Sequence, residues 1–341
     1  MAIGACSAPA NLPDLAAAEH MSDAGDLDGA IAAYHRAQIT CRAIKPPRRA
    51  RTVCADALLG EPDALDRAGR TPDAITAYLA IPARAAGDPT VAATATYRAG
   101  RLLLRADRPD QTAAAWTALW RVVTDYPDEP LAADALAALL ADGRARNPAA
   151  LAAELARLSR TPALARSTVA DNLAWSVADL DEHELADLPA ARALYDRIPV
   201  AYPASGLRDD ARWRGAQVSL ALHDPAGAIT RLRGLLATRE VSYMVGSYFS
   251  IWLDDAQLLL GQLLRDDLHD LPAAAAAFRR LPQDYPASVL RDDALYELAA
   301  TLALARDAPG ACHAVADLRV LEPESKFRAR ADALAAELAC P

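Results

Sequence analysis

Apolar residues recur at helical spacing along most of the chain, and small ones stand where two helices would meet. In the last such unit the order is Leu298, Leu302, Ala311, Val315 and Pro323. A small residue lets the two helix axes approach, a large residue one turn away fills the space between pairs, and proline ends the second helix. The pattern therefore predicts antiparallel helix pairs along the chain.

The clearest part of this pattern occurs twice. The segment DLPAARALYDRIPVAYPASGLRDDA covers residues 187–211, and DLPAAAAAFRRLPQDYPASVLRDDA covers residues 270–294 without a gap. The agreement continues on both sides at the same offset, so the duplicated block spans residues 171–236 and 254–319. A weaker third copy lies at residues 112–135. A match of this length predicts a repeat array that runs as one body over residues 12–341.

Paired aspartates in the repeat invite an interpretation as an acid and a base or as metal ligands. However, Asp209-Asp210 recurs as Asp292-Asp293 at the same place in the second copy. A catalytic group occurs once, whereas acidic residues just inside a helix start offset exposed N–H groups wherever a helix begins. We therefore interpret both pairs as helix starts.

Composition and charge narrow the possible functions. The chain is 53% hydrophobic but only 5% aromatic, and its net charge is −9. A nucleic-acid partner would require a basic face, so we expect none. The six histidines show no metal-binding spacing, and neither a phosphate-binding loop nor a nucleophile elbow is present. We expect no catalytic residue, no metal, no cofactor and no small-molecule substrate.

One of the five cysteines lies in a possible lipidation motif, and the other four lie near the two ends of the repeat array. Cys6 ends the sequence Ile3-Gly4-Ala5-Cys6, which has the pattern of a bacterial lipobox, so residues 1–11 are interpreted as a lipobox remnant and a tether. The charged and apolar leader that normally precedes a lipobox is not seen here. The other four cysteines form one pair near each end of the array: Cys41, Cys54, Cys312 and Cys340.

These four cysteines are disulfide candidates whose connectivity the sequence leaves open. Disulfides at both ends would resist fraying of terminal repeats, which lack one neighbour. The alternative is five buried thiols in a cytoplasmic protein, because free cysteine behaves as a small hydrophobic residue.

With these features the chain resembles tetratricopeptide-repeat (TPR) proteins, and in particular the periplasmic TPR lipoproteins of Gram-negative envelopes. The nearest types are the lipoprotein of the outer-membrane β-barrel assembly machinery and the Tol–Pal-associated TPR protein. The resemblance implies an all-α, right-handed superhelix (an α-solenoid) that acts as a scaffold or adaptor for other proteins of an envelope complex. It also implies that the chain meets the membrane only through a lipid on Cys6.

Two alternatives remain open at this point. One is a cytoplasmic TPR adaptor, although the lysines that such domains use to hold a carboxylate are missing, since Lys45 and Lys326 are the only lysines. The other is a non-catalytic helical partner of a peptidoglycan-processing enzyme.

Two segments are candidates for binding a partner. The first, residues 241–255, concentrates side chains that are enriched in interfaces: Tyr243, Met244, Tyr248, Phe249 and Trp252. The alternative is that these side chains fill the core of an extended helix.

The second candidate is the basic stretch that includes Arg48 and Arg49. It is predicted to form a loop between Cys41 and Cys54, where it would touch an acidic partner or anionic head groups. A purely solvated loop is the alternative.

Overall fold

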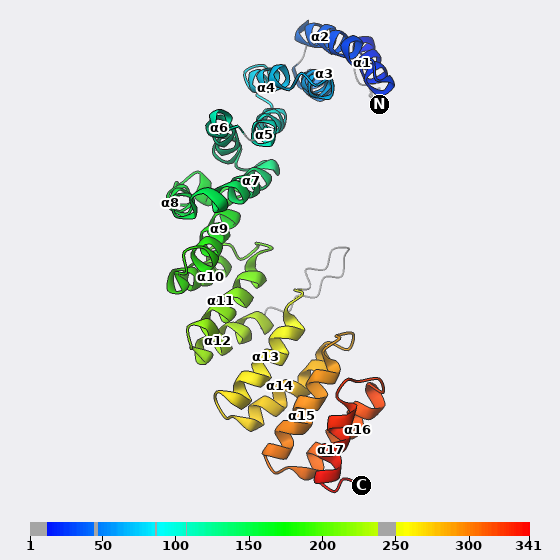
Figure 1. The fold of residues 1–341 in the computed structure, drawn as a ribbon, viewed down its shortest axis with the longest axis vertical. Helices are drawn as coiled ribbons and strands as arrows, with labels where there is room; N and C mark the ends of the chain where they lie inside the picture. The colour runs from blue at the N-terminus through cyan, green and yellow to red at the C-terminus, as the bar shows by residue number, and fades with distance from the viewer. Residues whose placement is uncertain (1–11, 44–46, 86, 107, 238–249) are drawn as a thin grey trace, which may run out of the picture. The chain divides into compact units, whose positions relative to one another are not determined.

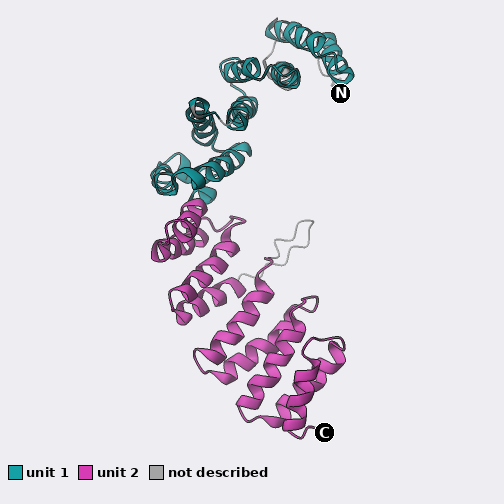
Figure 2. Ribbon diagram, in the orientation of Figure 1, with its two compact units in different colours: residues 1–173 teal, residues 174–341 magenta. Residues whose placement is uncertain are grey.

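The structure, a computed structural model, describes residues 12–43, 47–85, 87–106, 108–237 and 250–341. Over these residues it contains seventeen α-helices, one short 3-10 helix and no strand. Contacts group the chain into two compact units, residues 1–173 and 174–341, called unit 1 and unit 2 (Figure 2).

The helices alternate between first and second members of antiparallel pairs, called A and B helices (Figure 1). The A helices that begin in unit 1 are α1 (Pro13–Ala24), α3 (Pro47–Arg67), α5 (Pro89–Arg105), α7 (Leu131–Arg146) and α9 (Ala170–His183), the last of which continues into unit 2. The B helices of unit 1 are α2 (Leu27–Ala43), α4 (Thr71–Ala80), α6 (Pro109–Asp125) and α8 (Pro148–Leu158), and the 3-10 helix covers Leu164–Arg166.

Unit 2 continues the same alternation. Its further A helices are α11 (Arg208–Ala221), α13 (Leu253–Asp266), α15 (Arg291–Leu304) and α17 (Arg328–Glu337). Its B helices are α10 (Leu188–Ala201), α12 (Pro225–Leu236), α14 (Leu271–Asp284) and α16 (Ala308–Leu321).

Packing between successive pairs runs mainly from each B helix to the next A helix, as in α2 with α3, α10 with α11 and α14 with α15, and some A helices also touch one another. In unit 1 α3 contacts α1 and α5, and α5 contacts α7, while in unit 2 α15 contacts α13 and α17. The described residues therefore confirm the predicted all-α array of antiparallel helix pairs.

The sequence duplication is a duplication of a four-helix block. Helices α9, α10 and α11 correspond residue for residue to α13, α14 and α15 at the offset that separates Asp187 from Asp270. These two aspartates cap α10 and α14 by accepting a backbone N–H three residues on, with N–O distances of 3.1 Å. The same local interaction therefore starts the same helix in both copies.

Two disulfides join neighbouring elements near the ends of the described chain. Cys41 of α2 is bonded to Cys54 of α3 with a Cα–Cα distance of 5.7 Å, and Cys312 of α16 is bonded to Cys340 after α17 at 5.5 Å. The structure thus supplies the connectivity that the sequence left open. Each bond links a B helix to the A helix of the next pair or to the residues just after it, so it joins neighbouring repeats rather than distant parts.

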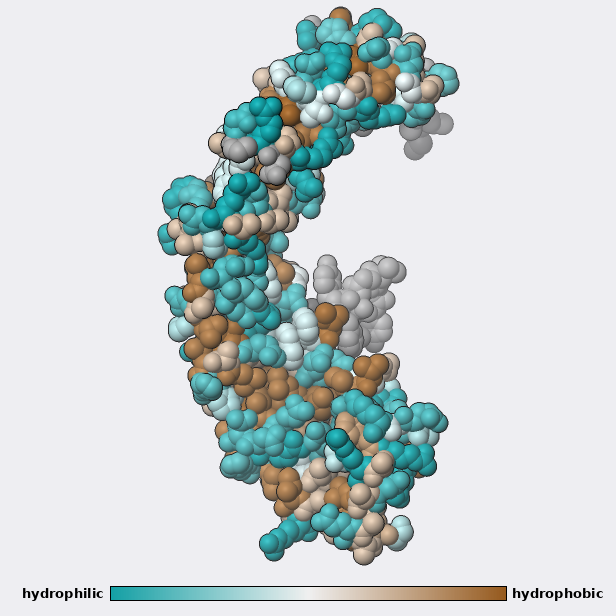
Figure 3. All heavy atoms as spheres, viewed as in Figure 1, coloured by the Kyte–Doolittle hydropathy of each residue, from teal (hydrophilic) through white to brown (hydrophobic). Residues whose placement is uncertain are grey.

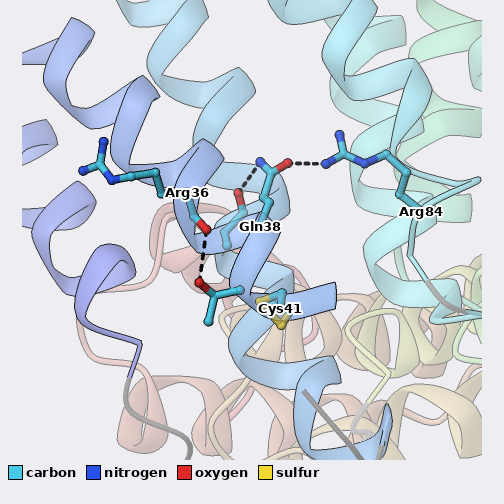
Figure 4. Close-up of a disulfide and its surroundings, with 7 residues drawn as sticks. Arg36, Gln38, Cys41 and Arg84 are labelled. Carbon is cyan, nitrogen blue, oxygen red and sulfur yellow. Dashed lines mark hydrogen bonds between the residues drawn. A yellow bond between two sulfur atoms is a disulfide. The ribbon is translucent and has the colours of Figure 1, made fainter. Parts of the chain in front are cut away.

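The first disulfide lies beside a buried amide (Figure 4). Gln38 donates from Nε2 to the carbonyl oxygen of Ala57 at 2.8 Å and to Glu61 Oε2 at 2.6 Å, and its Oε1 accepts a hydrogen bond from Arg84. Because a buried amide is costly unless it is paired, these bonds fix α2 against α3 and the turn after α4.

The basic stretch between Cys41 and Cys54 is not the predicted loop. Helix α2 continues to Ala43 and α3 begins at Pro47, so Arg48 and Arg49 lie in the first turn of a helix and the constrained basic loop is wrong. Proline favours the first helical position, because the N–H that it lacks would have no helical partner there. The side chains of both arginines lie outside the described part of the structure.

Candidate partner-binding site

The paired aspartates of the repeat hold the junction that precedes the next A helix. Asp292 Oδ2 accepts a hydrogen bond from Ser325 Oγ at 2.9 Å, and Asp254 Oδ2 accepts one from Ser288 Oγ at 2.6 Å. Each serine also accepts the backbone N–H two residues on, which shapes the turn. Asp209-Asp210 and Asp292-Asp293 lie in the first turns of α11 and α15, which confirms that they are helix starts. Asp292, and Asp254 in the first turn of α13, also connect successive repeats.

Trp252 has a comparable structural role. Its ring stacks on Trp213 of α11 with centroids 5.2 Å apart, and its Nε1 donates to Asp210 Oδ1. Tyr296 and Phe327 stack in the same way at the next repeat, 4.7 Å apart. The repetition indicates that Trp252 joins two A helices, so its aromatic surface is already used within unit 2.

The other partner-binding candidates of residues 241–255 cannot be compared with the structure. Tyr243, Met244, Tyr248 and Phe249 lie outside the described residues, as does Cys6. Their predicted roles stay predictions.

An aromatic ring beside an ion pair recurs between successive A helices. In unit 1 the Tyr78 hydroxyl is hydrogen-bonded to Asp63, which pairs with Arg98 at 2.5 Å. In unit 2 the Tyr195 hydroxyl donates to Glu182 at 2.9 Å, and Glu182 pairs with Arg214 at 2.6 Å. Burial, followed by the adjoining carboxylate, raises the pKa of Tyr78 and of Tyr195, so both phenols stay protonated.

The second copy of the block carries this ion pair with its charges exchanged. Arg265 stands where the first copy has Glu182, Glu297 stands where it has Arg214, and Phe278 replaces the tyrosine. Arg265 pairs with Glu297 and lies over the Phe278 ring, 5.7 Å from its centroid. Comparing the two copies by charge would have shown this pairing in the sequence, which the search for catalytic motifs missed.

Unit 1 has a groove on its A helices. One cavity of 340 Å³ lies against α3, α4 and α5, and it is lined by Asp63, Asp66, Tyr78, Tyr97, Arg98, Arg101 and Leu102. A second cavity of 500 Å³ lies against α5 and α7, and it is lined by Arg101, Leu102, Leu104, Arg105, Ala138, Ala141 and Asp142. The two share Arg101 and Leu102, so they meet on α5 and together form what is called here the α5 groove.

Most charges in the α5 groove are neutralised by neighbours. Arg98 pairs with Asp63, and Arg105 pairs with Asp66 at 2.9 Å. Asp142 accepts hydrogen bonds from Arg146 at 2.8 Å and from Trp116 Nε1 at 2.7 Å. The hydrogen bond from Arg146 is the main cause that lowers the pKa of Asp142, so this carboxylate is ionised and satisfied.

Arg101 is the exception. It is exposed, it lines both cavities, and it makes no hydrogen bond or ion pair with any residue that the structure describes. The uncompensated charge of the α5 groove is therefore positive, in a chain whose net charge is −9. No motif in the sequence marks Arg101, because it is one arginine among many.

The described residues contain neither a candidate metal site nor a candidate membrane span. No group of three or more histidine, cysteine, aspartate or glutamate side chains could hold a metal ion. None of the described helices combines the length and the apolar character needed to cross a membrane.

Comparison with known proteins adds a likeness of fold. Neither a protein-family model nor a curated protein sequence matches the chain. Among solved structures it is similar to the C-terminal part of a TPR protein from Cytophaga hutchinsonii, with 11% identity and a TM-score of 0.41 over 93% of this chain and 98% of that one.

Two further structures are similar at the same level. YrrB, a TPR protein with an unusual peptide-binding site, is 14% identical with a TM-score of 0.40 over 63% of this chain and 97% of its own. The human IFIT1 dimer with PPP-AAAA is 14% identical with a TM-score of 0.41 over 96% of this chain and 82% of that chain. At these identities and TM-scores the likeness carries no information about a partner.

Proposed function

We propose that the chain is a non-enzymatic TPR-type scaffold that binds a partner protein along the α5 groove. The observation that carries the proposal is the unpaired Arg101 between two cavities. An arginine side chain loses conformational freedom when it binds, but its planar fork of N–H donors matches a carboxylate with two parallel hydrogen bonds. The groove would therefore select a segment that presents a carboxylate at this point.

The side chains beside Arg101 indicate which other groups the bound partner segment would carry. Tyr97 and Leu104 lie on the same face of α5 as Arg101, one turn before it and nearly one turn after it. An extended segment that crosses α5 would place its carboxylate on the guanidinium and smaller apolar groups beside these two side chains. Arg98 and Arg105 already pair with Asp63 and Asp66, so Arg101 is the arginine of the groove whose charge a ligand carboxylate would compensate.

Replacing Arg101 with alanine tests this proposal. A hydrogen bond to a charged group contributes about 1.5–3 kcal/mol, so we expect the best acidic peptide of a panel to bind roughly 10- to 100-fold more weakly. Fluorescence anisotropy with peptides that differ only in Glu or Gln at one position measures the change. Arg121→Ala on α6 is the matched control, since Arg121 is exposed, pairs only with Asp125 and lies outside the groove.

Two results would contradict the proposal. One is a panel in which no acidic peptide binds better than its glutamine counterpart. The other is an equal loss of affinity in the Arg101 and Arg121 variants.

We further propose that the scaffold works in the periplasm, anchored to the outer membrane through Cys6 as part of an envelope complex. The two disulfides support this compartment, because disulfides persist in oxidising environments and are rare in the cytosol. Mass spectrometry of the protein from its native cells should find an acylated Cys6 and four cysteines that resist alkylation. Free thiols at these four positions, with an unmodified Cys6, would place the protein in the cytoplasm.

A further inference from the structure

The turns from A to B helices in unit 2 contain an unusual backbone conformation. In unit 1 the described turns after α1 and α3 place glycine in the left-handed region, at Gly25 and Gly69. In unit 2 every corresponding position is a residue with a side chain, with φ between 53° and 60°: Ala186, His223, His269, Arg306 and, after α17, Ala339. Glycine adopts this conformation without the steric cost that other L-residues incur. Unit 2 therefore keeps side chains on these turns where glycine would relieve the strain.

Exposed leucines accompany these positions. Leu185 and Leu268 come directly before the left-handed residues Ala186 and His269, and Leu304 comes two residues before Arg306. Their exposed fractions are 37%, 46% and 64%. Five other exposed large hydrophobic side chains of unit 2 lie at the B-to-A junctions, namely Val200, Ile251, Val289, Val320 and Leu321, and on the face shown in Figure 3 the larger hydrophobic areas lie over this unit.

The turns share one edge of unit 2. Because successive A helices run in one direction and B helices in the other, all A-to-B turns lie at the same ends of the helices. Figure 1 shows the turns that follow α13 and α15 on one side and the junctions that follow α14 and α16 on the opposite side. The name A–B edge is used for these turns, which comprise residues 184–187, 222–224, 266–270, 304–307 and 337–340.

The A–B edge is acidic. Its five turns carry eight aspartates and glutamates against one arginine, Arg306. Four of the acids, Asp187, Asp224, Asp270 and Asp307, cap the following B helices by accepting a backbone N–H. Asp224 also pairs with Arg192 at 2.9 Å, and Asp266 pairs with Arg265 at 2.7 Å. The remaining negative charge still exceeds the positive charge of Arg306. Such a surface repels anionic lipid and nucleic acid and favours a cationic partner.

We infer that the A–B edge of unit 2 docks a partner protein segment that carries lysine or arginine together with apolar side chains. The cationic groups would meet the acidic turns, and the apolar groups would cover Leu185, Leu268 and Leu304. This surface has the opposite charge preference from the α5 groove. One chain would thus hold two chemically different partners, and the inference does not depend on ligand binding in the groove.

A synthetic peptide of alternating lysine and leucine serves as the probe, with a glutamate–leucine peptide of the same length as its counterpart. We expect the lysine peptide to bind, and the double variant Leu268→Ser/Leu304→Ser to weaken it about tenfold or more, because two apolar contacts are lost. The matched control is Val200→Ser/Val289→Ser, since these valines are 81% and 86% exposed on the opposite, B-to-A side. The control should leave the affinity unchanged.

Several outcomes would overturn the inference. They are failure of the lysine peptide to bind, equal losses in the leucine and valine variants, and preference for the glutamate peptide or for vesicles of anionic lipid. Circular dichroism of each variant confirms that the helices are retained. Arg101→Ala should not change the affinity for the lysine peptide. A negative result at the A–B edge therefore does not bear on binding at the α5 groove, and a negative result at the groove does not bear on the edge.

Discussion

Reversing the charge of Arg265 with Arg265→Glu is expected to destabilise unit 2 by about 3 kcal/mol, the lower end of what breaking one side of a buried ion pair costs. The Arg265 and Glu297 side chains are only 15% and 21% exposed, so the variant places two carboxylates together in a site largely shielded from water. The loss also includes the contact of Arg265 with Asp266 and with the Phe278 ring. Urea unfolding measures the free energy of unfolding.

Adding the second reversal, Glu297→Arg, to the same chain is expected to recover most of the lost free energy of unfolding. The first copy of the block already carries that arrangement, as Glu182 paired with Arg214. The double-mutant cycle isolates the interaction, because each variant alone removes the same pair. Arg280→Glu is the control on an exposed surface, since Arg280 is 71% exposed. Additive losses from the two reversals would show that the exchanged pair does not connect α13 to α15.

Removing the disulfide between Cys312 and Cys340 with Cys312→Ser/Cys340→Ser is expected to lower the free energy of unfolding by about 3–4 kcal/mol. The bond closes a loop with a sequence separation of 28. Without it the unfolded chain gains conformational entropy, and this gain grows with the length of the loop. Among the described residues, helix α17 packs on α15 and α16 with few contacts. It should therefore fray first, and hydrogen exchange of its amides should accelerate most.

Reducing the native protein should reproduce the same change in exchange. The control is Cys41→Ser/Cys54→Ser, which should destabilise unit 1 and leave the exchange of α15 to α17 as it was. If α17 exchanges at the same rate with and without its disulfide, the bond does not stabilise the C-terminal pair.

The helix pairs could be predicted from the sequence because their signals are local. Aspartate caps, prolines at helix starts and small residues at pair contacts act within one pair, and the repetition of Asp187 as Asp270 marks the block without any knowledge of packing. The same repetition predicted that the paired aspartates are helix starts, and the structure places them in the first turns of α11 and α15. Here the structure adds detail, namely that Asp254 and Asp292 bind the serine of the next junction.

One local signal contradicts the predicted basic loop: proline at the first helical position starts α3 and carries Arg48 and Arg49 into that helix. The omissions concern contacts between pairs. Whether an arginine forms an ion pair depends on a residue of another helix pair. Arg98 and Arg105 form ion pairs with aspartates of α3, whereas Arg101 forms none with the described residues. No pattern along the chain distinguishes these three arginines, so the α5 groove could be found only in the structure.

A change of specificity at Arg101 tests the central claim, binding of a partner at the α5 groove, most directly. The affinities of two peptides of equal length, one with glutamate and one with lysine at the same position, are measured by titration calorimetry against the native chain and against Arg101→Glu. Binding by Arg101 predicts that the native chain prefers the glutamate peptide and that the variant prefers the lysine peptide. An unchanged preference in the variant would contradict the claim.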